Sequence, residues 1–109
     1  MGARVNYIFD DGTDALVALY SHWGADSIDY DLQEAFRHAE VRRGDHSYWT
    51  RMVISYLIQG QVMDETGFGI YAIKRGENLA LWGEPAVTID CATAQHDYVG
   101  YDSDEEDED

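Results

Sequence analysis

The four histidines of this sequence are the side chains best suited to acid–base chemistry. His22 follows an apolar segment and precedes Trp23, at a point where a strand is expected to lead into a helix. Loops of this kind often carry active sites, and a histidine there can act as a general base near neutral pH. The spacing fixes no Ser, Cys or Asp partner for His22, however. We therefore favour a structural interpretation, in which Trp23 anchors the loop in the core and His22 bonds a backbone group.

A second set of residues has the chemistry of metal ligands. His38, Asp45 and His46 lie where one predicted helix ends and the next begins, and Glu34 lies one turn before His38. Zinc sites usually show tighter signatures, such as His-Glu-x-x-His or paired cysteines. Solvated helix ends explain these residues better, so we predict no metal and no other cofactor. A small enzyme, a hydrolase or nuclease that uses His22 or a metal at His38 and His46, stays an alternative.

Three aspartates, Asp10, Asp11 and Asp14, crowd a predicted turn. Calcium-binding loops space their oxygen ligands regularly and end in a bidentate Glu, a pattern that this segment lacks. Aspartate is also a common turn residue, which is the simpler interpretation. The single cysteine, Cys91, excludes an internal disulfide. It lies in the alternating apolar segment 86–92, as is typical of a small core residue.

Carboxylates gather at the start of the first predicted helix, in the loop before a later strand and at the C-terminus. Helix capping and the helix dipole explain part of the first group. Together with the aspartates of the turn over 10–14, the first two groups can space negative charges across one surface as phosphates are spaced along DNA, and a merely solvated acidic face is the other interpretation. The candidate binding residues are Asp26, Asp29, Asp31, Glu34, Asp64, Glu65, Asp102, Asp104, Glu105, Glu106, Asp107, Glu108 and Asp109.

The charge balance restricts the class of partner. The chain has 22 acidic and 7 basic residues among 109, with a formal net charge of −15. Eight of the acids fall in the last thirteen residues, whereas residues 1–94 have fourteen acids and seven bases. A field of this sign repels phosphate backbones and attracts basic protein surfaces. Direct binding of nucleic acid is therefore disfavoured, and a basic, nucleic-acid-binding protein is the expected partner.

Four arginines are the counterargument to a purely acidic surface. Arg37, Arg42, Arg43 and Arg51 fall within fifteen positions. They suit a basic patch for nucleic acid, a docking site for the acidic C-terminus, or salt bridges with the neighbouring Glu34 and Glu40. The long-range electrostatic term opposes the first of these, and the other two stay open.

The hydrophobic pattern predicts the elements that position these residues. Apolar runs and alternation predict strands over 3–9, 15–20, 68–74, 79–82 and 86–91. A helical stripe predicts a helix from about 27 to 43, and a second helix is predicted over about 47–60, capped by Asp45 or Ser47. We expect one α+β domain over residues 1–94 in the order ββααβββ, with an antiparallel sheet and both helices on one face. Residues 95–109 are expected to form a disordered acidic tail.

Three short segments carry a resemblance to a protein family. Segment 19–24 reads Leu-Tyr-Ser-His-Trp-Gly, segment 47–54 begins Ser-Tyr-Trp, and segment 65–70 reads Glu-Thr-Gly-Phe-Gly-Ile. With these motifs the chain resembles, over about residues 3 to 92, a family of small proteins from phages of actinobacteria and from prophages of their hosts. The resemblance implies no catalytic residues. It implies expression in bacterial cytoplasm and favours a role in host takeover or anti-defence.

The sequence therefore predicts a non-enzymatic binding protein. We expect it to inhibit or modulate a host or defence protein by covering that protein's basic nucleic-acid-binding surface, as a DNA mimic does. Restriction, CRISPR, DNA-repair and transcription proteins are the candidate targets. No segment approaches the ~20 apolar residues of a membrane span. A self-associating module is a further alternative, because the aromatic second helix, with Tyr48, Trp49, Tyr56 and Leu57, can form a homodimer interface.

Overall fold

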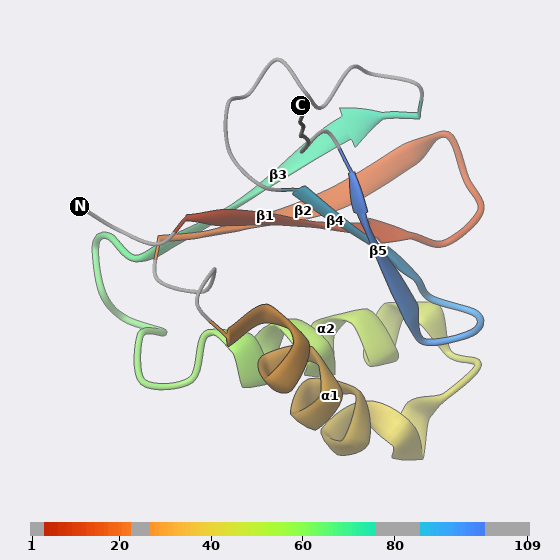
Figure 1. The fold of residues 1–109 in the computed structure, drawn as a ribbon, viewed down its shortest axis with the longest axis horizontal. Helices are drawn as coiled ribbons and strands as arrows, with labels where there is room; N and C mark the ends of the chain where they lie inside the picture. The colour runs from red at the N-terminus through yellow and green to blue at the C-terminus, as the bar shows by residue number, and fades with distance from the viewer. Residues whose placement is uncertain (1–3, 23–26, 76–85, 100–109) are drawn as a thin grey trace, which may run out of the picture.

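Residues 4–22, 27–75 and 86–99 are described by the computed structural model, and they form one five-stranded sheet and two α-helices. Figure 1 shows the sheet above and both helices below it. The elements in chain order are β1 (Val5–Asp10), β2 (Ala15–Ser21), α1 (Ile28–Ala39), the 3-10 turn η2 (Glu40–Arg42), α2 (His46–Leu57), β3 (Phe68–Lys74), β4 (Ala86–Asp90) and β5 (Gln95–Val99). The predicted α+β class is confirmed.

The sheet is mixed, so the prediction of an antiparallel sheet was wrong. Its strand order is β3-β2-β1-β4-β5, and β1 pairs with β4 in parallel while the other three pairs are antiparallel. The prediction assumed that successive strands pair with each other, which is only the commoner case. Here β3 pairs with the outer edge of β2, so the free edge of β1 is left for β4. The predicted strand over 79–82 and the tail from residue 100 lie outside the described residues.

The fifth strand, β5, lies in the segment that we assigned to the acidic tail. It pairs antiparallel with β4, from Asp90↔Gln95 to Ala86↔Val99. The turn that joins the two strands has none of the usual Gly, Pro or Asn signals. Asp90 instead accepts hydrogen bonds from the backbone N–H groups of Ala92 and Thr93, and Ala94 adopts a positive φ of 57°. The sequence signal for a turn was therefore weak, and the strand after it was missed.

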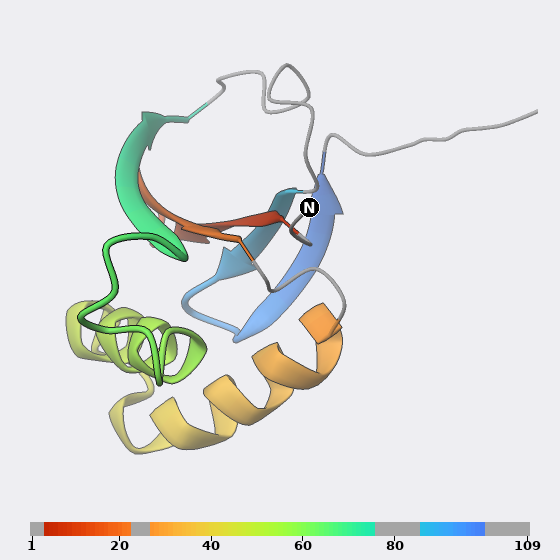
Figure 2. The ribbon, with the colours of Figure 1, turned by 90° about the vertical axis from the view of Figure 1, so that its left-hand side faces the viewer.

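The two helices cover one face of the sheet, as predicted (Figure 2). Helix α1 buries Ile28, Leu32, Ala35 and Ala39, the stripe that the sequence indicated, but it ends at Ala39 and continues only as the 3-10 turn. Helix α2 is capped by Asp45, whose side chain accepts a hydrogen bond from the N–H of Tyr48. It ends at Leu57, a little before the predicted end.

The core lies between the helices and the sheet. Alternation along the strands points Tyr7 and Phe9 of β1 and Val87 and Ile89 of β4 at the helices. Trp49 of α2 is fully buried among them, and truncating such a side chain typically costs about 3–5 kcal/mol. The apolar face of α2 is thus largely covered within the described part of the chain. Strand residues on the opposite face, including Ile8 and Ala18, are buried as well.

Candidate functional site

Each of the three described acids that we predicted on α1 has a partner within the chain. Ser27 donates a hydrogen bond from Oγ to Asp31 Oδ2 over 2.8 Å, and Arg37 Nη2 lies 3.3 Å from Glu34 Oε2. Asp29 is bound by two residues of β5. Local contacts therefore account for much of this acidic helix start. Asp26 and the acids from Asp102 to Asp109 lie outside the described residues.

The contacts of Asp29 join α1 to β5. His96 Nε2 lies 2.9 Å from Asp29 Oδ1, and the Tyr98 hydroxyl donates a hydrogen bond to the same oxygen over 2.6 Å. These bonds, that of Tyr98 first, hold the pKa of Asp29 below its usual value because they favour the charged carboxylate. A carboxylate, an imidazole and a phenol in contact have the chemistry of a general acid–base site. Sequence reasoning missed this cluster because it placed no strand at residues 95–99.

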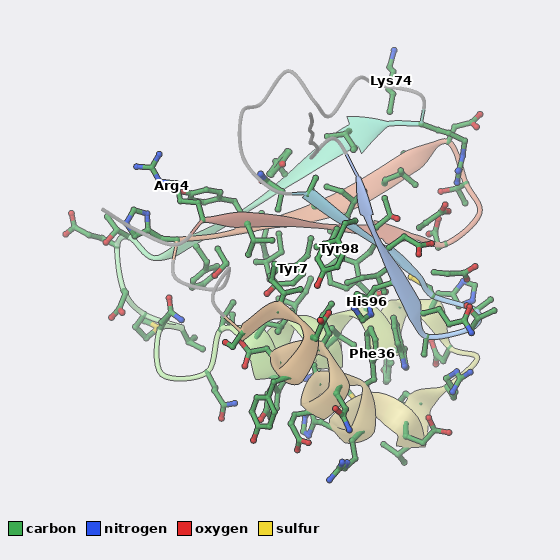
Figure 3. All side chains as sticks on the ribbon, viewed as in Figure 1. Arg4, Tyr7, Phe36, Lys74, His96 and Tyr98 are labelled. Carbon is green, nitrogen blue, oxygen red and sulfur yellow. The ribbon has the colours of Figure 1, made fainter. Side chains whose placement is uncertain are left out.

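Tyr7 lies beside this cluster with an unsatisfied hydroxyl. Its side chain is only 1% exposed, and its hydroxyl has no hydrogen-bond partner in the described structure. Figure 3 shows Tyr7 and Tyr98 in the gap between the sheet and α1, with His96 and Phe36 further along the same gap. Burial raises the pKa of Tyr7 far above its usual value, and the charge of Asp31 adds to the effect. The phenol of Tyr7 is therefore neutral at physiological pH.

A groove of about 590 Å³ runs between α1 and the edge strand β5, and we call it the α1–β5 groove. Its lining residues are Asp29, Gln33, Phe36, Ala94, Gln95, His96 and Asp97. The ring of Phe36 stacks on the buried Trp49 at 5.4 Å and lies 6.2 Å from the His96 ring, centroid to centroid. The lining includes the carboxylate of Asp29 and no Lys or Arg, while the side chain of Asp97 alternates with that of His96 and so lies on the face of β5 away from α1. It therefore suits a polar, cationic ligand better than an anionic one.

Another group of carboxylates lies where β1 and β4 end. Because these strands are parallel, their carboxyl ends meet, and Asp10 stands opposite Asp90 in the register. Asp11 and Asp14 follow on the β1–β2 turn, at the right of Figure 1, and we call these four aspartates the acidic end. Arg75 donates two hydrogen bonds to Asp10, over 3.1 and 2.6 Å, and lowers the pKa of that carboxyl. The sequence could not place Asp90 here, because its position follows from the parallel pairing.

A second cavity, of about 460 Å³, lies beside the acidic end. It is lined by Phe9, Asp11, Val17, His46, Ser47, Thr50 and Cys91. Cys91 is fully buried, as predicted, and its Sγ lies 3.5 Å from Thr50 Oγ1. Burial raises the pKa of Cys91, so the thiol is protonated and a poor nucleophile. The cysteine therefore belongs to the core.

His22 is tied to the loop before β3. Its backbone N–H donates to the carbonyl of Gly67 over 2.8 Å, and its Nδ1 lies 3.2 Å from the hydroxyl of Tyr20. A cavity of about 510 Å³ lies here, lined by Tyr20, His22, Thr66, Gly67 and Phe68. The imidazole contacts a phenol, and the backbone N–H of the same residue bonds a backbone group. Trp23 lies outside the described residues.

The residues considered above as metal ligands make other contacts in the structure. Asp45 caps α2, the His38 ring lies 6.0 Å from that of Tyr56, and His46 lines the second cavity. Among residues 4–22, 27–75 and 86–99, no group of three or more His, Cys, Asp or Glu side chains is placed to hold a metal ion.

Asp64 and Glu65 are exposed on the loop between α2 and β3. This loop lies at the left of Figure 1, whereas the acidic end lies at the right. The described members of the predicted binding set are therefore divided between the start of α1 and this loop, and the structure adds Asp90 to the aspartates of the β1–β2 turn as a third group.

Comparison with known proteins finds no match for this chain among family models, curated proteins or solved structures. Within the described part of the chain, no helix is both long enough and apolar enough to cross a membrane. The structure places the chain in the α+β class, with a five-stranded mixed sheet and a carboxylate-rich surface.

Proposed function

We propose that this protein is a phage-type acidic binding protein of the bacterial cytoplasm, which acts without catalysis by occupying the basic nucleic-acid-binding surface of a host or defence protein. One observation carries the proposal. The described residues include twelve carboxylates and seven Lys and Arg side chains, and eight of those carboxylates form no ion pair with a described residue.

The seven basic side chains all make internal contacts. Three arginines form ion pairs: Arg37 with Glu34 at 3.3 Å, Arg43 with Glu40 at 3.1 Å, and Arg75 with Asp10 at 2.6 Å. Arg42 lies 4.8 Å from the ring centre of Tyr48, and Arg51 donates to Ser55 Oγ over 3.2 Å. Arg4 and Lys74 also interact within the chain. The predicted salt bridges with Glu34 and Glu40 are confirmed, and they weaken the case for a basic patch.

The carboxylates of the chain outnumber these basic side chains. Of the twelve that the structure describes, eight form no ion pair with any described residue. These eight are Asp11, Asp14, Asp31, Asp45, Asp64, Glu65, Asp90 and Asp97. The uncompensated charge of the described surface is therefore negative, and the acids from Asp102 onward add to it.

Charge of this size acts mainly on association. A single exposed ion pair contributes only about 0–1 kcal/mol, so no one carboxylate can provide the affinity. A summed field, in contrast, can raise association rate constants from about 10⁵–10⁶ to about 10⁸ M⁻¹s⁻¹ at low salt. The proposal therefore requires several carboxylates and a strong dependence on salt.

Affinity capture with the full chain as bait tests the proposal. Bacterial lysate is passed over the wild-type chain at low salt and at about 0.5 M salt, where surface charges are screened. The comparison bait has Asp11→Asn, Asp14→Asn and Asp90→Asn. Asparagine keeps an acceptor oxygen, so the turn hydrogen bonds to Thr13 and Ala92 persist while the charge is removed. Arg42→Gln, which makes the net charge more negative, is the opposite control.

We expect the wild-type bait to capture a basic, nucleic-acid-binding protein at low salt, Arg42→Gln to capture at least as much, and the triple variant to capture less. Failure to capture any such protein at either salt concentration would contradict the proposal. Equal capture by the triple variant would show that the binding surface is not the acidic end but the tail or the other acids.

A further inference from the structure

The α1–β5 groove has the geometry of a peptide-binding groove. Four successive residues of β5 and its turn, from Ala94 to Asp97, form one wall, so the groove follows the edge of the strand. The other wall is Asp29, Gln33 and Phe36, which recur on α1 with the spacing of one helix face. An edge strand facing a helix is an arrangement that accepts an extended peptide as an added strand.

The backbone of β5 is open at this edge. Among residues 4–22, 27–75 and 86–99, β5 is the last strand in the sheet order, and β4 is the one strand that pairs with it. Thr88 Oγ1 of β4 lies 3.4 Å from the carbonyl oxygen of Asp97, which places that carbonyl on the β4 side. Because backbone groups alternate along an antiparallel strand, those of His96 then point to the outer edge of the sheet, beside the groove. A peptide strand can pair with them.

The width of the groove is fixed by the contacts of Asp29. The hydrogen bonds from His96 and Tyr98 to Asp29 hold β5 against the first turn of α1. Phe36 is held from behind by its stacking on Trp49. The site is therefore formed before any ligand binds, which lowers the entropic cost of binding.

The chemistry of the lining selects the occupant. The Asp29 side chain is 73% exposed at the rim, and the lining has no Lys or Arg. An arginine side chain can bond a carboxylate through its guanidinium group and stack on an aromatic ring such as Phe36. A second copy of this chain is a poor occupant, because it would bring a net charge of −15 against the carboxylate of Asp29.

We propose that an extended, arginine-bearing segment of the basic partner protein binds in the α1–β5 groove as an added strand beside β5. This inference rests on the proposed function and names the contact by which the partner is held. The long-range field brings the partner close, and the groove provides the short-range, oriented contacts.

A defined peptide tests the groove with the full chain. The probe is the peptide Arg-Val-Arg-Val-Arg-Val. Two matched peptides have the same sequence with every second backbone amide N-methylated, one in each of the two possible alternations. N-methylation keeps the charge but removes the donors that strand pairing needs. Affinity is measured by calorimetry, and backbone contact by the NMR shift and exchange rate of the His96 amide.

Two variants with the same change in charge separate the groove from the general field. Gln33→Arg places a cation in the groove, whereas Gln59→Arg places one on the turn after α2, outside the groove lining. Both glutamines are exposed, so both variants should fold. We expect Gln33→Arg to weaken binding of the unmodified peptide about tenfold and Gln59→Arg to change it less than about twofold.

The outcomes separate this inference from the proposed function. Slowed exchange at His96, weaker binding of an N-methylated peptide and the selective loss in Gln33→Arg would support the groove. Equal binding of all the peptides, or an equal loss in both variants, would overturn the groove and leave a charge-driven binding protein. Absence of binding by the peptide while the captured partner still binds would also overturn it. Absence of binding by the peptide and by every basic protein would overturn both.

Discussion

At the scale of single residues, Asp29 is a carboxylate that contributes to the surface charge and also holds β5 against α1. The residue was expected to be part of a solvated acidic face, and its exposure agrees with that, but its Oδ1 holds two side chains of β5. Removing the charge of Asp29 therefore affects an element far away in the sequence as well as the surface potential. Its role is both structural and electrostatic.

This role predicts a specific loss of stability in acid. The hydrogen bonds from Tyr98 and His96 lower the pKa of Asp29 in the folded state. The stabilisation is present above the unfolded pKa of about 3.9 and is lost as the pH falls through the lower folded value. We expect the melting temperature of Asp29→Asn to fall less steeply than that of the wild type below about pH 4. Parallel profiles for the two proteins would contradict the assignment.

The second prediction at this scale concerns Tyr7. A buried hydroxyl without a partner costs about 1–3 kcal/mol, so Tyr7→Phe should stabilise the fold by about 1 kcal/mol in urea unfolding. Burial raises the pKa of Tyr7, so the unfolded chain loses its proton first and wild-type stability falls as the pH rises above about 10. Tyr7→Phe should lack this alkaline component. Tyr30→Phe, at a 64% exposed position, is the control and should change little. Destabilisation by Tyr7→Phe would show that the hydroxyl has a partner.

At the scale of elements, the parts that follow from local pattern were predictable and the pairings were not. Strand β3 has the predicted bounds, the α1 stripe is buried as expected, and Asp45 caps α2. These features depend on residues near one another in the sequence. The parallel pairing of β1 with β4 depends on which sheet edge is free, and no local signal carries that information.

Strand β5 was missed because the turn before it has an unusual sequence, and that turn gives a testable prediction. Ala94 has a φ of 57° in the turn before β5, a conformation that costs an alanine about 1–2 kcal/mol. Ala94→Gly removes that strain, at an entropic cost of about 0.5–1 kcal/mol, and should stabilise the fold by up to about 1 kcal/mol. The matched change Ala92→Gly, at a position without positive φ, should destabilise it. Urea unfolding of both variants checks this, and destabilisation by Ala94→Gly would argue against the β4–β5 hairpin.

At the scale of the whole molecule, the charge was visible in the sequence but its distribution was not. Composition gave the excess of acids and the direction of long-range forces. Only the fold shows that Glu34 and Glu40 neutralise arginines, that Asp29 binds β5, and that Asp90 joins the acidic end. The structure therefore adds Asp90 and the α1–β5 groove to the helix start, the loop and the C-terminal acids that the sequence predicted as the site.

This distribution predicts that folding and binding depend differently on charge. Replacing the acids of the C-terminal segment, from Asp102 to Asp109, by Asn and Gln should leave the melting temperature unchanged within about 1 °C, because isolated surface charges contribute little. The association rate constant with the captured partner should fall about tenfold at low salt and approach the wild-type value at about 0.5 M salt. Stopped-flow mixing measures both, and an unchanged rate at low salt would assign the steering to the other acids.

Competition with DNA for the captured partner tests whether this protein covers a nucleic-acid-binding surface. Labelled double-stranded DNA is bound to the partner, the full-length protein is titrated in, and fluorescence anisotropy reports the DNA that remains bound. We expect the protein to displace the DNA, and the Asp11→Asn, Asp14→Asn, Asp90→Asn variant to do so less well. A ternary complex, with the DNA still bound when the partner is saturated with the protein, would contradict this expectation.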